Sequence, residues 1–137
     1  MQNRVAAIQM TSTHEVSQNL FSAGNLIKEA ADAGAKLIVL PEMFAIMGLD
    51  QMDKVKYRET AGHGLIQAFL RDQALKNHIY LVGGTIPITV PENPGKVFAA
   101  CFVHNDQGQT IARYDKKHRR NRQAKRRLPG CEHHRSR

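Results

Sequence analysis

The 137-residue sequence has only two cysteines and few aromatic residues (6%). Two cysteines, Cys101 and Cys131, are too few for a disulfide framework. No apolar run approaches the roughly 18 residues of a membrane span, and the N-terminus, MQNRVAAIQM, lacks the apolar region of a signal peptide. An apolar share of 42% in a chain of one-domain length is typical of a soluble globular protein. We therefore expect a cytoplasmic protein without a membrane partner.

Acidic residues are scarce at one end of the chain only. Residues 1–117 hold twelve Lys and Arg residues against eleven Asp and Glu, whereas residues 118–137 hold eight against one. The net charge of +8 therefore comes almost entirely from the C-terminal tail, HRRNRQAKRRLPGCEHHRSR. This tail has no aromatic residue, no β-branched residue and no periodic apolar face, so we expect it to be disordered. The sequence predicts a domain at 1–118 and a separate basic tail at 119–137.

The first 34 residues predict a strand followed by a helix. Residues 4–10, RVAAIQM, alternate like a strand, and we expect that strand to be central in a sheet. Ser12 and Glu15 have the spacing of a capping box. Apolar residues then recur every three or four positions from 16 to 30, which predicts a helix that ends at Gly34. With the strand that follows, this segment predicts a β-helix-β unit of an α/β fold.

The stretch KLIVLPEMFAIM, residues 36–47, places a carboxylate at the end of a buried strand. Its run LIVL is continuously apolar, and the next residue, Pro41, cannot donate to a sheet. Glu42 therefore lies at the carboxyl end of a strand, where α/β proteins usually bind ligands. We expect the neighbouring Met43, Phe44 and Ile46 to exclude water from it. The alternative interpretation is a glutamate in an ordinary surface turn.

The remainder of the domain predicts a second helix and three further strands. Residues 65–76 are helical in pattern, and residues 79–85 form a buried strand that ends in Gly83 and Gly84. These glycines indicate either a β-bulge or the close approach of a neighbour or ligand. A loop at 87–95 contains three prolines, Pro87, Pro91 and Pro94. Residues 96–104 and 109–114 then flank the turn NDQG as a hairpin.

Four motifs resemble one known family: VAAIQM, LIVLPEMF, IYLVGGTIP and NDQGQTIARYDKKH. In this order they are similar to the N-terminal half of the carbon-nitrogen hydrolase (nitrilase) superfamily, from about residue 4 to residue 118. The resemblance is strongest to the amidase branch that includes deaminated-glutathione amidases. It implies an α/β fold that forms half of an α-β-β-α sandwich. It also implies hydrolysis of a small amide or nitrile C–N bond without a cofactor, and homo-oligomers in intact relatives.

The resemblance assigns two members of a Glu-Lys-Cys triad. Glu42 matches the general base of the family's LPE motif. Lys116 matches the lysine of its YxKxH motif, and the Tyr114-x-Lys116-x-His118 spacing favours it over the adjacent Lys117. The chemistry of the triad is a thiolate attacking the carbonyl or nitrile carbon, while a carboxylate takes the proton and an ammonium stabilises the developing charge.

The third member of the triad, the nucleophilic cysteine, has no counterpart. In the family it lies some tens of residues after the lysine, in an elbow that reads roughly C-Y-D-x-R-F-P-E. Cys131 stands in PGCEHHRSR, which does not match, and Cys101 stands in FAACFV, where we expect a buried hydrophobic residue. We therefore expect a truncated, inactive hydrolase. The abrupt change of composition after His118 is interpreted as a disruption of the reading frame.

The basic tail leaves two other interpretations to weigh. Its Arg and Lys residues could bind nucleic acid or another polyanion without base specificity and with strong salt dependence. This is the alternative to the hydrolase assignment. Cys131, His133 and His134 suggest metal ligands, but they lack a fourth ligand and a scaffold, so no metal site is expected.

Overall fold

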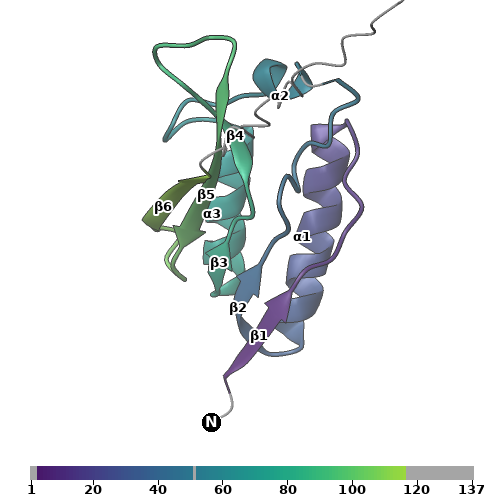
Figure 1. Cartoon of the computed structure of the whole chain (residues 1–137). Coiled ribbons are helices and arrows are strands. Elements are labelled where there is room, and N and C mark those ends of the chain that lie inside the picture. Colours follow the sequence, from purple (N-terminus) through teal and green to yellow (C-terminus); the bar gives the residue numbers. More distant parts are fainter. Residues whose placement is uncertain (1–2, 51, 117–137) are drawn as a thin grey trace, which may run out of the picture.

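The computed structural model describes residues 3–50 and 52–116, which form one sheet with helices packed against it (Figure 1). In the part of the chain that the structure describes, no helix is both long enough and apolar enough to cross a membrane. The basic tail at 119–137, Lys117 and His118 lie outside the described residues. The elements, in chain order, are β1 (Arg4–Ala7), α1 (Val16–Asp32), β2 (Ala35–Val39), α2 (Asp53–Lys56), α3 (Leu65–Asn77), β3 (Tyr80–Val82), β4 (Ile86–Thr89), β5 (Val97–His104) and β6 (Thr110–Lys116).

The sheet combines a parallel part with an antiparallel part. Strands β1, β2 and β3 are parallel neighbours, which confirms the predicted β-helix-β unit. Strand β5 runs antiparallel to β3, β4 and β6 and joins them into one six-stranded sheet. The expectation that the first strand is central was wrong. Among the described strands β1 pairs with β2 alone, and its Val5 is 68% exposed at the edge of the sheet.

The two long helices, α1 and α3, pack side by side against one face of the sheet (Figure 1). The strands alternate, so every second side chain points into the core between sheet and helices. Ile38 of β2 and Leu81 of β3 are fully buried there against Ile27 and Leu70 of the helices. The described residues form one α layer on one β layer.

The opposite face of the sheet is apolar and carries no covering element among the described residues. Register pairs its members across five strands, from Val5 beside Leu37 at one edge to Cys101 beside Tyr114 at the other. Water therefore reaches apolar surface that sandwich proteins normally bury. The apolar side chains that register places on this open face include Val5, Ala7, Leu37, Val39, Tyr80, Val82, Cys101, Val103, Ala112 and Tyr114.

The predicted capping box before α1 was wrong. The N-cap residue is Glu15, and no side chain caps the helix. Ser12 instead donates its hydroxyl hydrogen to the carbonyl of Phe44 at 2.7 Å, and the Thr13 hydroxyl accepts the Glu15 N–H at 3.2 Å. The sequence pattern failed because a tertiary partner took the hydroxyl that the motif would have used. At the other end the prediction is confirmed, since Gly34 takes a positive φ of 96° and donates to the Ala31 carbonyl.

Pro87 lies in a strand and not in the predicted loop. It is the second residue of β4, where it stands opposite Ala99 of β5. On its other side β4 forms an isolated bridge between Ile88 and Glu59, so it is close to an edge strand. A proline is tolerated there because the ladder can dispense with one donor. The hairpin that follows is confirmed, with Gly108 at φ 72° closing its turn.

A buried histidine on β5 makes the stability of the domain depend on pH. The side chain of His104 is 1% exposed. Its Nδ1 lies 3.2 Å from the Thr110 hydroxyl, and its Nε2 has no hydrogen-bond partner among the described residues. Burial, with a smaller contribution from the charge of Arg71, lowers the pKa of His104. The folded domain therefore favours the neutral ring.

We expect the free energy of unfolding to fall as the pH drops below about 6.5, the pKa of histidine in an unfolded chain. Below about pH 6.5 the unfolded chain binds a proton at this histidine, whereas folded His104 stays neutral because its pKa is lowered. Above about pH 6.5 the histidine is neutral in both states, so the free energy of unfolding no longer depends on it. Urea unfolding at a series of pH values near and below about 6.5 measures the slope of the free energy of unfolding against pH. His104→Gln should flatten it, whereas His63→Gln, at an exposed position, should leave it unchanged. An equal slope in wild type and His104→Gln would contradict the prediction.

Candidate active site

The structure brings Glu42 and Lys116 together from positions 74 residues apart in the chain. Glu42 follows the end of β2, and Lys116 is the last residue of β6. Lys116 Nζ donates to Glu42 Oε1 at 2.5 Å. Both side chains are about half exposed, at 48% and 56%, so a solute can reach them.

The pair lies at the rim of an open depression of about 470 Å³ on the uncovered face of the sheet. This volume falls within the usual range of roughly 300–1,000 Å³ for small-molecule sites. A carboxylate, an ammonium, a thiol and two hydroxyls converge on it. Its lining residues are Val39, Leu40, Glu42, Val82, Gly84, Thr85, Cys101, Tyr114 and Lys116.

Three contacts in succession join the segment before and after Glu42 to the end of β3. The Leu40 N–H donates to the Val82 carbonyl at 2.9 Å. Gly84, at φ 61°, lies so close to Pro41 that a Cβ there would be 2.1 Å from the Pro41 carbonyl oxygen. The Met43 N–H then donates to the Thr85 hydroxyl at 3.0 Å. Of the two predicted roles for the Gly83-Gly84 pair, close approach by a neighbour is the one that the structure shows.

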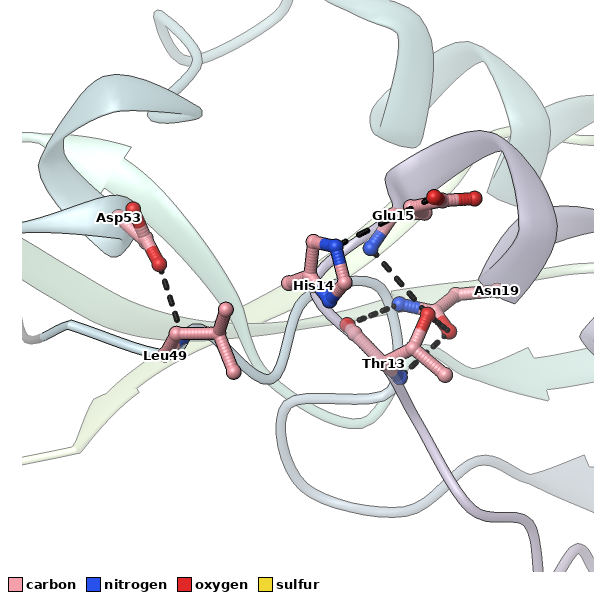
Figure 2. A network of polar contacts seen from close by, with 6 residues as sticks. All are labelled: Thr13, His14, Glu15, Asn19, Leu49 and Asp53. Carbon is pink, nitrogen blue, oxygen red and sulfur yellow. Dashed lines mark hydrogen bonds and ion pairs between the residues drawn. The ribbon is translucent and has the colours of Figure 1, made fainter.

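The chain beyond Glu42 is held from its other side by α1 and the loop before it. Asn19, only 1% exposed, donates to the Ala45 carbonyl at 2.9 Å. The same amide group donates to the Thr13 carbonyl and accepts the Thr13 N–H (Figure 2). Ser12 holds the Phe44 carbonyl in the same way. Residues 43–45 are therefore fixed by side chains of two separate parts of the fold.

The expectation that apolar neighbours exclude water from Glu42 was wrong. Met43, Phe44 and Ile46 are buried as predicted, but they belong to the interior of the domain. The Glu42 side chain is 56% exposed on the open face of the sheet. A backbone that turns sharply at Met43 sends successive side chains to different sides, and the sequence pattern does not reveal that turn.

Cys101 differs from its expected role as a buried hydrophobic residue. It is half-buried and lines the depression, because the alternation of β5 turns Ala100 and Phe102 toward the helices and Cys101 away from them. Burial raises the pKa of the Cys101 thiol, which lowers its thiolate fraction and disfavours it as a nucleophile. Cys131 and Lys117, the other sequence candidates, lie outside the described residues.

Sequence reasoning missed Thr85 and Tyr114 as members of the site. Tyr114 stands directly opposite Cys101 on the neighbouring strand, and Thr85 follows the two glycines. A hydroxyl residue after a Gly-Gly pair at a strand end was the available signal for Thr85. For Tyr114 the motif spacing was noted, but the face on which its ring lies could be read only from the register of β6.

The sequence profile of the carbon-nitrogen hydrolase family matches residues 4–133 of the chain, extending beyond His118 into the basic tail. The chain belongs to the carbon-nitrogen hydrolase family. A nitrilase homolog 2 from Dictyostelium discoideum is 36% identical over 115 residues, which is 84% of this chain and 34% of the relative. A deaminated glutathione amidase from Synechocystis is 34% identical over 113 residues, or 82% and 41% of the two chains. Human omega-amidase NIT2 is 33% identical over 120 residues, or 84% and 40%.

Solved structures of the carbon-nitrogen hydrolase family confirm the fold. The NitFhit protein of C. elegans superimposes with a TM-score of 0.75 at 26% identity, covering 83% of this chain and 27% of that one. Nit3 of Saccharomyces cerevisiae, a member of the nitrilase superfamily, gives 0.73 at 30% identity, with 83% and 44% covered. The chain thus has the predicted α/β fold of this superfamily and spans about two fifths or less of the curated relatives described above.

The contact between Gly84 and Pro41 should make Gly84 one of the least replaceable glycines in the domain. We expect Gly84→Ala to destabilise the domain by more than the roughly 1–2 kcal/mol that a left-handed φ alone costs, because the backbone must also move. Gly62→Ala is the matched control, since Gly62 also has a positive φ, of 89°, but has no atom within 4 Å of the added Cβ. Urea midpoints measure both. If Gly84→Ala and Gly62→Ala lowered the free energy of unfolding equally, the close approach of Gly84 to Pro41 would contribute nothing to the cost of the substitution.

Proposed function

We propose that this chain supplies the Glu-Lys part of a carbon-nitrogen hydrolase active site for small amides or nitriles, with Glu42 and Lys116 in the catalytic roles. The observation that carries the proposal is the 2.5 Å contact between these two side chains at the rim of an open, substrate-sized depression. The amidase names of the similar proteins support an amide as the substrate class. Among the described residues that line the depression, the charged side chains are this one carboxylate and this one ammonium.

The chemistry needs a nucleophilic thiol, and among the described residues the one thiol that lines the depression is Cys101. In the first step the thiol sulfur attacks the amide carbonyl carbon, Glu42 accepts the thiol proton and Lys116 stabilises the negative oxygen. The amine takes that proton and leaves, as ammonia where the amide is primary, and a thioester remains. In the second step Glu42 activates a water that hydrolyses the thioester to the acid and regenerates the thiol. Cys101, with its raised thiol pKa, is not assigned this role.

A chimaera tests the assignment of Glu42 and Lys116. Residues 4–116 replace the matching part of the Synechocystis deaminated glutathione amidase, whose own remainder supplies the rest of the site. We expect hydrolysis of deaminated glutathione. Glu42→Gln should lower kcat by about 10²–10⁴-fold, the usual value of a general base. Lys116→Ala should lower it by about 10²–10³-fold, the usual cost of losing a group that stabilises an oxyanion.

Lys28→Ala is the matched control, because Lys28 is another exposed lysine in an ion pair, 2.7 Å from Asp32, but it lies on α1. It should leave kcat unchanged. The 137-residue chain by itself should show no thiol-dependent amidase activity. If the unmodified chain turned over an amide and Glu42→Gln abolished this, Cys101 or Cys131 would have to be the nucleophile. A chimaera that kept full activity after both substitutions at Glu42 and Lys116 would exclude their catalytic roles.

We also propose that the reading frame is disrupted close to codon 118, so that residues 119–137 do not carry the original hydrolase sequence, although the family profile extends to residue 133. The support is that charge and composition change inside a motif and not at a linker. The nucleotide sequence after codon 118 should then encode, in a shifted frame, an apolar continuation that leads to a Cys elbow. Stop codons crowding both shifted frames would contradict this. Loss of a salt-sensitive polyanion interaction on deletion of 119–137 would instead favour a selected basic anchor.

A further inference from the structure

We propose that Thr85 is a positioning residue for Glu42, acting through the backbone N–H of Met43. The inference rests on the proposed function, which makes Glu42 the base of the site. Among the described residues, it concerns the one hydrogen bond in which a side chain that lines the depression holds the backbone next to Glu42. Thr85 itself need not touch the reacting atoms to act in this way.

The backbone at Met43 has a conformation that needs outside support. Met43 has φ 53°, in the left-handed region, and it is one of two described residues other than glycine with a positive φ. The left-handed region is energetically unfavourable for L-residues other than glycine, because Cβ lies too close to the following carbonyl oxygen. The Met43 N–H donates to Thr85 Oγ1 at 3.0 Å. Without that acceptor, a partly buried donor would be unpaired in a disfavoured conformation.

The acceptor is itself rigidly placed. Thr85 stands between Gly84, which lies against the Pro41 carbonyl, and Ile86, the first residue of β4. Ile86 pairs with Ala100 of β5, and Gly83 donates to the Phe102 carbonyl at 2.9 Å. The hydroxyl is therefore fixed by the sheet on both sides. Because Thr85 is held in place, its hydroxyl can fix the conformation of the Met43 peptide.

Glu42 depends on this arrangement because the ion pair cannot hold it alone. Both partners of the Glu42–Lys116 contact are about half exposed, and such surface pairs contribute little to stability. If Met43 returned to a right-handed or extended conformation, the Cα–Cβ bond of Glu42 would turn relative to β6. The carboxylate would then leave Lys116. The geometry of the pair thus follows from the Thr85 hydrogen bond and not from the attraction between the charges.

The experiment measures the ion pair directly in the full 137-residue chain by NMR. A scalar coupling between Lys116 ¹⁵Nζ and the Glu42 carboxyl ¹³C, transmitted through the hydrogen bond, reports the contact, and Lys116→Gln assigns the signal. We expect the coupling in wild type, its loss in Thr85→Val, which keeps the shape and removes the acceptor, and its return in Thr85→Ser. Thr85→Ala, which adds no methyl group in place of the hydroxyl, gives the same test if the valine variant does not fold.

Ser12→Ala is the matched control for a purely structural effect. It removes another hydroxyl bond to the same segment, at the Phe44 carbonyl, and should leave the coupling intact even if it lowers the melting temperature. A coupling that persists in the folded Thr85 variants, or that Ser12→Ala abolishes equally, would overturn the proposal. Because the readout is the ion pair and not turnover, an inactive chimaera would count against the proposed function without deciding the role of Thr85.

Discussion

The close approach of Gly84 to the Pro41 carbonyl is the constraint on which the arrangement of the site depends. It can exist because Gly84 has no Cβ, and the space that the missing carbon leaves is taken by a carbonyl oxygen. With the ends of β2 and β3 in contact at this point, the next residue on one side is Thr85 and the next on the other is Glu42. Gly84 thus sets the distance between the ends of β2 and β3. That distance in turn fixes how far Thr85 lies from Glu42.

The Glu42–Lys116 pair illustrates how topology creates a site that no local segment contains. Glu42 follows a parallel strand, whereas Lys116 ends an antiparallel strand of the hairpin at the other side of the sheet. Strands β3 and β5 separate them in sheet order, and the turn after β2 closes the gap. Since both side chains are about half exposed, their contact contributes little to folding. The contact holds a carboxylate beside an ammonium at the rim of the depression.

Among the described residues no helix or strand covers the second, apolar face of the sheet, and the chain spans about two fifths or less of the relatives' length. In the described residues the depression is open, and burial raises the pKa of Cys101, the thiol that lines it. The described residues thus hold a carboxylate and an ammonium in contact at this open depression.

Periodicity and turn chemistry in the sequence determined both long helices, the parallel β-helix-β unit and the hairpin, because these depend on neighbours a few residues away. Motif spacing also singled out Glu42 and Lys116. Tertiary structure alone decided that Ser12 bonds Phe44 instead of capping α1, that Pro87 lies in a strand and that Glu42 is exposed beside Lys116. These outcomes depend on partners 12 to 74 residues away, which only the folded sheet brings into contact. A sequence pattern indicates which hydrogen bonds and contacts a residue is able to make. Which of these contacts form depends on how strands that are distant in the sequence pack together.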